Sequence, residues 1–326
     1  MKIQKLVLGL IILLLFGASA FAQSPMLLAL NKKDSTLAFI DPATMKLVGK
    51  VATGDSPHEV IFSSDGKTAY VSNYGAQVPG SSLSVIDVAS RKEIRRVDLA
   101  PLMRPHGMQE IGGKVYFTAE VNRAIARYDP VANKVDWLMG TGQNGSHMIV
   151  VGADQKRMYT ANIGSDSVTA FEFGNVPPAG SKFTHIPVGK QPEAIDLSPN
   201  GKEIWVGLNA DLAVDIVDAA TLKVVERIKL GERPYRVRFS RDGKSVLFTM
   251  PNTKEIIVYD AGTRKETGRL KLDNVPLGAV FSDDGSTVFI TVVQPDKVLK
   301  IDLKSMSVTG AADSGAEPDG VAFFGK

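Results

Sequence analysis

The sequence contains no cysteine, and this absence excludes several kinds of chemistry at once. Disulfides, a lipoprotein attachment, a cysteine nucleophile and haem attachment through C-x-x-C-H all need the thiol. Tryptophan is also scarce, because the two residues present are too few for a repeated stacking motif. We therefore expect the stability of the chain to come from packing alone.

Two motifs of common enzymes are missing as well. No glycine-rich phosphate loop follows a strand and opens a helix, so nucleotide binding is not expected. No serine stands in a G-x-S-x-G elbow, and no segment shows a sustained helical period.

The first residues form a separate unit. Lys2 and Lys5 precede an apolar run over residues 6–16, and Ala20-Phe21-Ala22 follows. A basic start, a short apolar middle and an A-x-A end predict a secretory signal peptide over residues 1–22, cleaved after Ala22 to leave Gln23 first. The alternative is a membrane anchor, but the apolar run is too short to span a bilayer comfortably. We expect a periplasmic or secreted protein with no membrane span after cleavage.

Removal of Lys2 and Lys5 also changes the charge. Of 38 basic residues 36 remain against 35 acidic ones, a net charge of +1. The sequence therefore predicts no nucleic-acid partner. We expect a monomer.

The rest of the chain, residues 23–326, is a repeat. An acidic residue closes the third strand of each expected unit, at Asp41, Asp87, Asp129, Glu172, Asp218, Asp260 and Asp302. A period of about 40–45 residues is typical of a four-stranded propeller blade. Short strands rich in Val, Ile, Phe and Tyr alternate with polar residues, as half-buried strands do.

Turn signals separate the first two strands of each unit. Asp65-Gly66, Gly112-Gly113, Asn200-Gly201, Asp242-Gly243 and Asp284-Gly285 predict tight primed hairpin turns, whereas Asp154-Gln155 predicts a different turn. The last unit stops after a first strand near Asp319, and the mature chain begins with a second strand near Leu28. Six complete units and one composite unit predict an all-β, seven-bladed propeller of four-stranded antiparallel blades, closed by a blade from both termini. An open β-solenoid or a pair of β-sandwiches would not explain the complementary ends.

Tyr70-Val71-Ser72-Asn73, after Ser63-Ser64-Asp65-Gly66-Lys67, resembles the repeat of the YVTN propeller family, as does Tyr159-Thr160-Ala161-Asn162 less closely. That family is related to lactonase-like and cytochrome d1-type propellers, and the resemblance covers the mature chain. It implies the propeller fold, whereas family members range from binding modules to hydrolases. Lactonase-type propellers place His, Glu and Arg in the channel, and this chain is similar in residue type.

The position after the recurring proline should form a ring at the channel mouth. Its occupants are His58, His106, His147, Glu193, Tyr235, Leu277 and Asp319. Three of the four histidines of the chain occupy this position in consecutive blades. Each histidine could simply bond to a neighbouring backbone, but packing alone does not explain the alignment of all three.

Two chemistries fit this ring. His58, His106, His147 and Glu193 could bind a divalent transition metal such as zinc, iron or copper. Without a metal, His58 and His106 could act as general acid or base with Glu193, while Arg104 and Arg233 hold an anionic or lactone substrate.

Further candidate ligand-binding residues are Asn73, Tyr74, Glu120, Asn162, Tyr235 and Asp319. Asparagine at a strand end is also an ordinary turn former, whereas Glu120 stands in a histidine-bearing unit and is a candidate ligand or base. The sequence thus predicts an exported propeller that binds a small molecule, metal or protein at its channel mouth. The alternative is a metal- or His-dependent lactonase-like hydrolase that uses the same ring.

Overall fold

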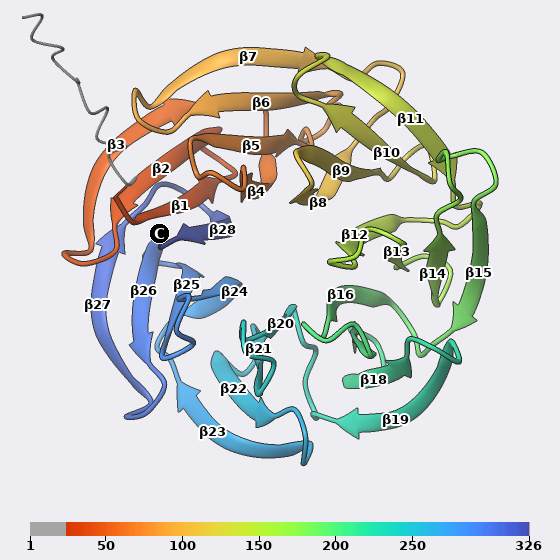
Figure 1. The fold of residues 1–326 in the computed structure, drawn as a ribbon. Coiled ribbons are helices and arrows are strands. Elements are labelled where there is room, and N and C mark those ends of the chain that lie inside the picture. The colour runs from red at the N-terminus through yellow and green to blue at the C-terminus, as the bar shows by residue number, and fades with distance from the viewer. Residues whose placement is uncertain (1–23, 326) are drawn as a thin grey trace, which may run out of the picture.

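The computed structural model describes residues 24–325, and these residues form strands, turns and bends without a helix. Twenty-eight strands build seven four-stranded antiparallel sheets. The sheets stand around a central channel like blades, with the first strand of each innermost (Figure 1). The predicted seven-bladed propeller is confirmed. The predicted signal peptide and Gln23 lie outside the described residues.

No helix within residues 24–325 has the length and apolar character needed to cross a membrane.

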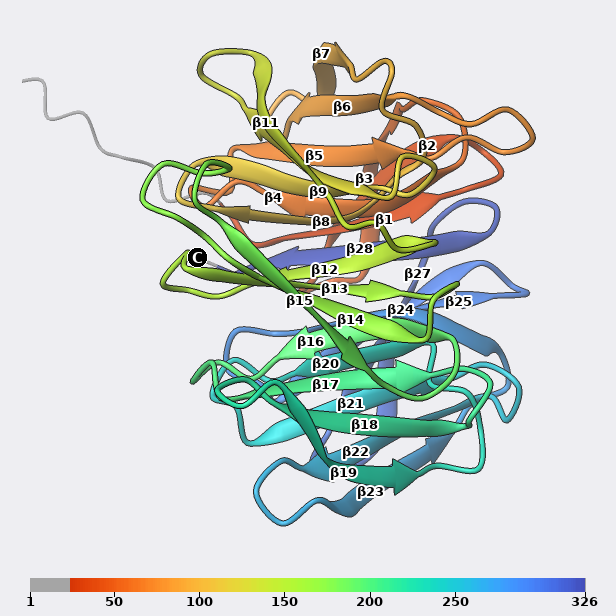
Figure 2. The same ribbon diagram turned by 90° about the vertical axis from the view of Figure 1, so that its right-hand side faces the viewer.

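The composite blade consists of strands from both ends of the chain. From the channel outward it contains β28 (Pro318–Phe324), β1 (Met26–Asn31), β2 (Thr36–Asp41) and β3 (Lys46–Ala52). Seen from the side, β28 lies next to β1 in one sheet (Figure 2), with Leu28 opposite Ala322. Because β28 covers the inner edge of β1, the ring closes as predicted, through pairing of the two chain ends.

Each of the other six blades follows chain order from its inner to its outer strand. They are β4 (Pro57–Phe62), β5 (Thr68–Asn73), β6 (Ser82–Asp87) and β7 (Lys92–Asp98); β8 (Pro105–Ile111), β9 (Lys114–Ala119), β10 (Ala124–Asp129) and β11 (Lys134–Gly140); β12 (Ser146–Val151), β13 (Arg157–Asn162), β14 (Ser167–Glu172) and β15 (Lys182–Pro187); β16 (Pro192–Leu197), β17 (Glu203–Leu208), β18 (Ala213–Asp218) and β19 (Lys223–Lys229); β20 (Arg236–Phe239), β21 (Ser245–Met250), β22 (Glu255–Asp260) and β23 (Lys265–Lys271); β24 (Val275–Phe281), β25 (Thr287–Val293), β26 (Lys297–Asp302) and β27 (Ser307–Asp313).

The apolar core lies between neighbouring blades rather than inside any one of them. Val168 of β14 and Ile204 of β17, for example, belong to one buried cluster that joins two blades. The outer strands are mostly exposed, and five of the six outside the composite blade begin with lysine. Lysine at an exposed edge discourages pairing with other chains, so these residues protect the rim of the ring.

The recurring acidic residues confirm the period and have a structural purpose. Each ends the third strand of its blade, and Asp41, for example, accepts hydrogen bonds from the backbone nitrogens of Ala43 and Thr44 at 2.8 and 3.1 Å. The backbone hydrogen bonds lower the pKa of Asp41. The period therefore reports a turn that leads into the outer strand.

The turns between first and second strands differ from the prediction. Only Gly112-Gly113 is a two-residue turn in which both residues have positive φ, 60° and 74°. The Asp-Gly and Asn-Gly pairs lie instead in five-residue loops, where only the glycine is left-handed.

A hydroxyl organises these longer loops. Ser63 Oγ donates to Asp65 at 2.7 Å and accepts from the Thr68 backbone nitrogen at 3.0 Å. Gln155 takes the glycine position of such a loop, with φ 56° and the same closing bond to Gly152 at 2.8 Å. The expectation of a different turn there is wrong, because glutamine adopts the conformation that glycine has elsewhere.

Candidate functional site

A bulge in the inner strand places the ring residues. In six blades the pairing between first and second strands shifts register immediately after the recurring position 57, 105, 146, 192, 276 or 318. In the remaining blade, β20 begins one residue after Tyr235. A bulge frees a residue from the ladder and re-aims its side chain. The backbone therefore repeats the same bulge in six blades around the channel, and each blade places its own side chain at that position.

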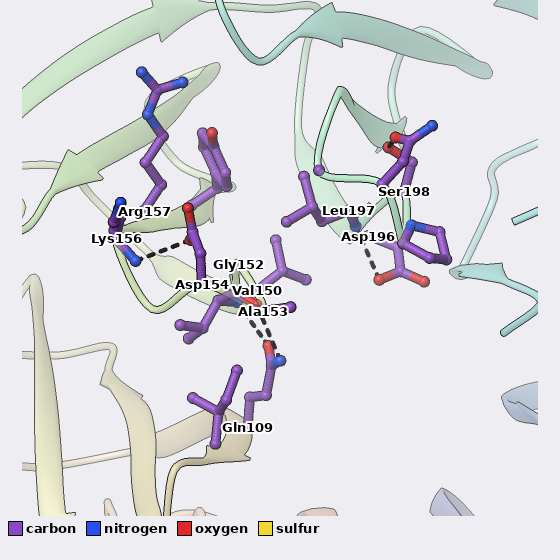
Figure 3. A pocket seen from close by; sticks show the side chains of 16 residues that line it. Gln109, Val150, Gly152, Ala153, Asp154, Lys156, Arg157, Asp196, Leu197 and Ser198 are labelled. Atoms are coloured by element: carbon purple, nitrogen blue, oxygen red, sulfur yellow. Dashed lines mark hydrogen bonds between the residues drawn. The ribbon is translucent and has the colours of Figure 1, made fainter. Parts of the chain in front are cut away.

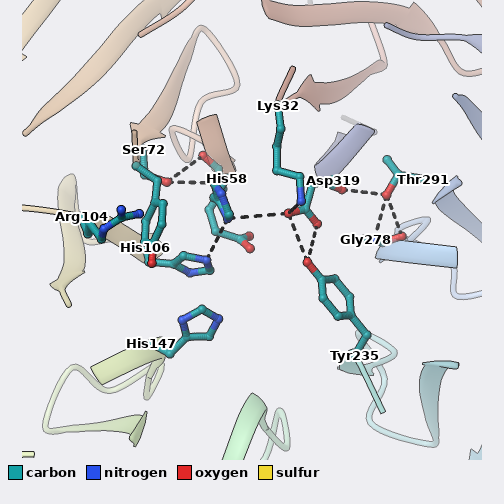
Figure 4. Close-up of polar contacts among 12 residues, drawn as sticks. Lys32, His58, Ser72, Arg104, His106, His147, Tyr235, Gly278, Thr291 and Asp319 are labelled. Carbon is teal, nitrogen blue, oxygen red and sulfur yellow. Dashed lines mark hydrogen bonds and ion pairs between the residues drawn. The ribbon is translucent and has the colours of Figure 1, made fainter. Parts of the chain in front are cut away.

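The structure brings the three ring histidines together at the channel mouth (Figure 4). His58 Nδ1 lies 3.2 Å from His106 Nε2, and the rings of His106 and His147 stack with centroids 3.8 Å apart. Burial lowers the pKa of His58 to about 4 and that of His106 well below its usual value. Near neutral pH these two imidazoles are therefore uncharged.

The hydrogen-bond pattern indicates the tautomer of His106. Its Nδ1 is buried, and no partner for it lies among residues 24–325. A bare lone pair costs less there than an unpaired N–H group, because a lost donor carries the full desolvation penalty. His106 therefore donates from Nε2 to His58 Nδ1, which leaves the Nε2–H group of His58 as a donor.

A carboxylate holds the third histidine, and it is Glu120 rather than the predicted Glu193. His147 Nδ1 lies 2.9 Å from Glu120 Oε1, and the Tyr74 hydroxyl donates to Oε2 of the same carboxylate. Burial would raise the pKa of Glu120, but the hydrogen bond and charge of His147 and the bond from Tyr74 hold it below its usual value. His147 therefore donates from Nδ1, and its Nε2 faces away from Glu120.

Tyr74 connects the histidines with Arg104. Its ring centroid lies 4.4 Å from that of His58 and 5.2 Å from that of His106. The Arg104 guanidinium lies 4.5 Å from the Tyr74 centroid and donates to the backbone oxygens of Gly75 and Ala76. Burial, followed by the hydrogen bond to Glu120, raises the pKa of Tyr74 to about 12. Arg104 thus braces the loop that carries Tyr74. We call His58, His106, His147, Tyr74 and Glu120 the histidine arc.

On the other side of His58 lies a buried carboxylate, Asp319. Its Oδ2 is 3.8 Å from His58 Nδ1 and 3.3 Å from Lys32 Nζ, and the Tyr235 hydroxyl donates to its Oδ1 at 3.1 Å. Burial would raise the pKa of Asp319, but the charges of Arg236 and Lys32 outweigh it and hold the pKa below its usual value. The predicted residues Tyr235 and Asp319 therefore meet the arc through His58.

Several predicted residues do not join the arc. Glu193 accepts a hydrogen bond from Asn209, and Arg233 lies 5.9 Å from the centroid of Tyr235. Asn73 binds Ser82 and Ser84 within its own blade at 3.0 Å, and Asn162 likewise binds hydroxyls of its blade. These contacts are consistent with the alternative interpretation of both asparagines, that of ordinary turn formers at a strand end.

Within residues 24–325, no three His, Asp or Glu side chains are grouped as a metal ion requires. His58 Nδ1 lies between His106 Nε2 and Asp319 Oδ2, so these three candidate ligand atoms follow one another in a chain of contacts. The tautomer of His106 occupies its Nε2 with a proton, so this nitrogen is not a metal ligand in this arrangement.

The sequence reasoning missed Lys32, Glu59 and Arg236. Glu59 and Arg236 immediately follow ring positions, where the other blades carry Gly107, Met148, Ala194, Gly278 and Gly320. Two charged residues among small and apolar ones were a usable signal. Lys32 lies in a loop and gave none.

Two cavities of about 420 Å³ open beside the mouth, and Lys32 lines both of them. One also reaches His58 and Ser56. A larger cavity of about 610 Å³ lies at the other ends of the inner strands, between Val150 of β12 and Asp196 of β16 (Figure 3). There Gln109 bonds to both backbone groups of Val151, at 2.7 and 3.1 Å, so it ties two blades together.

Comparisons with known proteins agree with the fold. The family model "Cytochrome D1 heme domain" matches residues 151–302. A search of curated proteins found no match.

Among solved structures, a functionally unknown protein from Desulfotomaculum acetoxidans has a TM-score of 0.79 at 12% identity, over 92% of this chain and 99% of that one. A provisionally assigned 6-phosphogluconolactonase from Bacteroides uniformis has a TM-score of 0.77 at 14% identity, over 93% and 100%. Hydrazine synthase from Kuenenia stuttgartiensis has a TM-score of 0.68 at 19% identity, over 83% and 95%. These structures show the fold of a seven-bladed β-propeller, and residues 151–302 are similar to the cytochrome d1 haem domain family.

Proposed function

We propose that this propeller binds a small polar molecule at its channel mouth, on the histidine arc. The observation that carries the proposal is the convergence of His58, His106 and His147 from three consecutive blades, with ring centroids 5.0 and 3.8 Å apart. A bulge aims each of them inward, and Glu120 fixes the orientation of one. Packing needs no such alignment of three imidazoles, of which His58 borders an open cavity.

The arc offers a donor and an acceptor. His58 presents its Nε2–H group, and in the neutral ring His147 Nε2 carries a lone pair. Lys32 and His58 border the same cavity, so a ligand there can also reach a cation. We therefore expect a ligand that carries both hydrogen-bond donors and acceptors.

A thermal-shift panel of sugars, amino acids, carboxylic acids and lactones tests the proposal. At least one compound should raise the melting temperature of the wild-type protein, and the shift should fall by more than half in His147→Ala and Glu120→Gln. Thr184→Gln, on the exposed face of β15, is the control and should keep the shift. Equal shifts in all variants, or no shift with any compound, would contradict the proposal.

A specific contact favours a second function, His-dependent hydrolysis. An imidazole held by a carboxylate at 2.9 Å has the arrangement of a general base, which would take a proton from water or from a substrate hydroxyl. Hydrolysis of 4-nitrophenyl acetate and of a δ-lactone checks this function. The rate should fall at least tenfold in His147→Ala, and a rate equal to that of buffer for the wild type would rule the function out.

The proposal also includes expectations about metal content, the location of the protein and its oligomeric state. Elemental analysis of the purified protein should find less than one zinc, iron or copper per chain, since the arc does not group its donors. N-terminal sequencing should find Gln23 first after export, and sedimentation should find a monomer that binds no nucleic acid.

A further inference from the structure

A buried ionic cluster crosses the channel below the histidine arc. Arg236 of β20 is 2% exposed, and its Nη2 lies 2.5 Å from Glu59 Oε1 of β4 and 3.5 Å from Asp319 Oδ1 of β28. These partners are 177 and 83 residues away along the chain. Figure 1 places β20 across the channel from β4. One side chain therefore links three blades.

Further donors converge on Asp319, the second residue of the last strand. The Tyr235 hydroxyl lies 3.1 and 3.2 Å from its two oxygens, and Lys32 Nζ, from the loop after β1, lies 3.3 Å from Oδ2 (Figure 4). The Arg236 guanidinium also stacks 4.7 Å from the Tyr235 centroid. We call Lys32, Glu59, Tyr235, Arg236 and Asp319 the clasp.

The clasp pairs cations with carboxyl groups, which a buried site requires. Lys32 and Arg236 supply two cations, and they face the carboxyl groups of Glu59 and Asp319. Burial raises the pKa of Glu59, and the Arg236 guanidinium beside it acts in the opposite direction. Burial would lower the pKa of Arg236, but Glu59, Tyr235 and Asp319 outweigh it and raise the pKa further, so the guanidinium stays charged. Removing one partner leaves a buried charge unpaired, which is far more costly than losing a surface ion pair.

We propose that the ion pairs and hydrogen bonds of the clasp hold the C-terminal strand β28 in the ring. The backbone of β28 pairs with β1, a strand from the other end of the described residues, so this ladder joins segments that are distant along the chain. The clasp adds bonds from the loop after β1, through Lys32, and from the opposite wall, through Arg236. Opening the ring at β28 therefore requires breaking the clasp as well as the β1–β28 ladder.

Hydrogen exchange followed by mass spectrometry tests the clasp, because local opening shows as faster exchange in one region. In Arg236→Met, amides of β28 and β1 should exchange at least tenfold faster, while those of β13 and β14 stay as in the wild type. Arg269→Met is the control, since Arg269 lies on β23 of the same blade and bonds to Glu266 and Glu255 at the surface. This control should leave β28 unchanged.

A cross-link keeps the test decisive if Arg236→Met folds poorly. Ala29 and Val321 are paired across β1 and β28, and the chain has no cysteine to compete. Ala29→Cys with Val321→Cys should restore folding and slow β28 exchange in the Arg236→Met background. Uniformly faster exchange in all blades, unchanged exchange in β28, or failure of the cross-link to rescue the variant would each overturn the proposal.

Discussion

The pKa of His58 makes the folded protein sensitive to mild acid. Burial lowers it from 6.5 in the unfolded chain to about 4 in the folded one. Between these values the unfolded chain binds a proton that the folded protein does not, so the free energy of unfolding falls as the pH drops through this window. The full shift corresponds to about 3 kcal/mol, of which about 2 kcal/mol is lost by pH 5.

Urea unfolding at pH 7.5 and pH 5.0 measures this contribution. His58→Gln keeps a polar side chain that does not titrate, so it should lose about 2 kcal/mol less than the wild type between the two pH values. Thr184→Gln, on exposed β15, should lose as much as the wild type. Equal losses in the His58 variant and the wild type would refute the assignment of a buried, uncharged His58.

Three further perturbations have defined outcomes. Gly320→Ala would place a Cβ atom 2.3 Å from the backbone oxygen of His58, so urea unfolding should show a loss of about 1–3 kcal/mol. Ser240→Ala removes the hydroxyl that donates to Asp242 at 2.7 Å, and the same assay should show a loss of about 1 kcal/mol; a wild-type midpoint would contradict the turn assignment. Deleting residues 318–326 exposes the inner edge of β1, and gel filtration should find aggregate; a stable monomer would contradict closure by β28.

The architecture was predictable because the repeat carries it. The acidic residue that ends each third strand and the complementary chain ends determined seven blades and their closure, and the structure confirms both. The loops were less predictable, because Asp65-Gly66 reads as a two-residue turn unless the bond from Ser63 is known. The sequence alone does not show how many residues belong to a loop that is closed by a serine hydroxyl.

The site was predictable only in part, and the reason is distance along the chain. The ring position followed from the repeat, so His58, His106 and His147 were identified together. Glu120 was also a candidate ligand or base, but its pairing with His147 was not predicted, because Glu120 reaches His147 from the neighbouring blade while the ring residue Glu193 bonds to Asn209. Contacts between blades depend on side-chain direction, which the period does not encode.

Ring position and bulge together explain how one fold can hold different ligands. The bulge is a backbone feature common to six blades, whereas its side chain varies from histidine to leucine to aspartate. A blade can therefore change what it presents to the channel without changing its ladder. In this chain the variation gathers imidazoles on one side of the mouth and buried charges on the other.

Nuclear magnetic resonance of protein labelled with nitrogen-15 in histidine tests the central claim most directly. The chain has four histidines, so the imidazole spectrum contains few signals. Adding the compound that raises the melting temperature most should shift the nitrogen signals of His58, His106 and His147 and leave those of His185, on β15, in place. A shift confined to His185, or no shift at saturating compound, would contradict binding at the channel mouth.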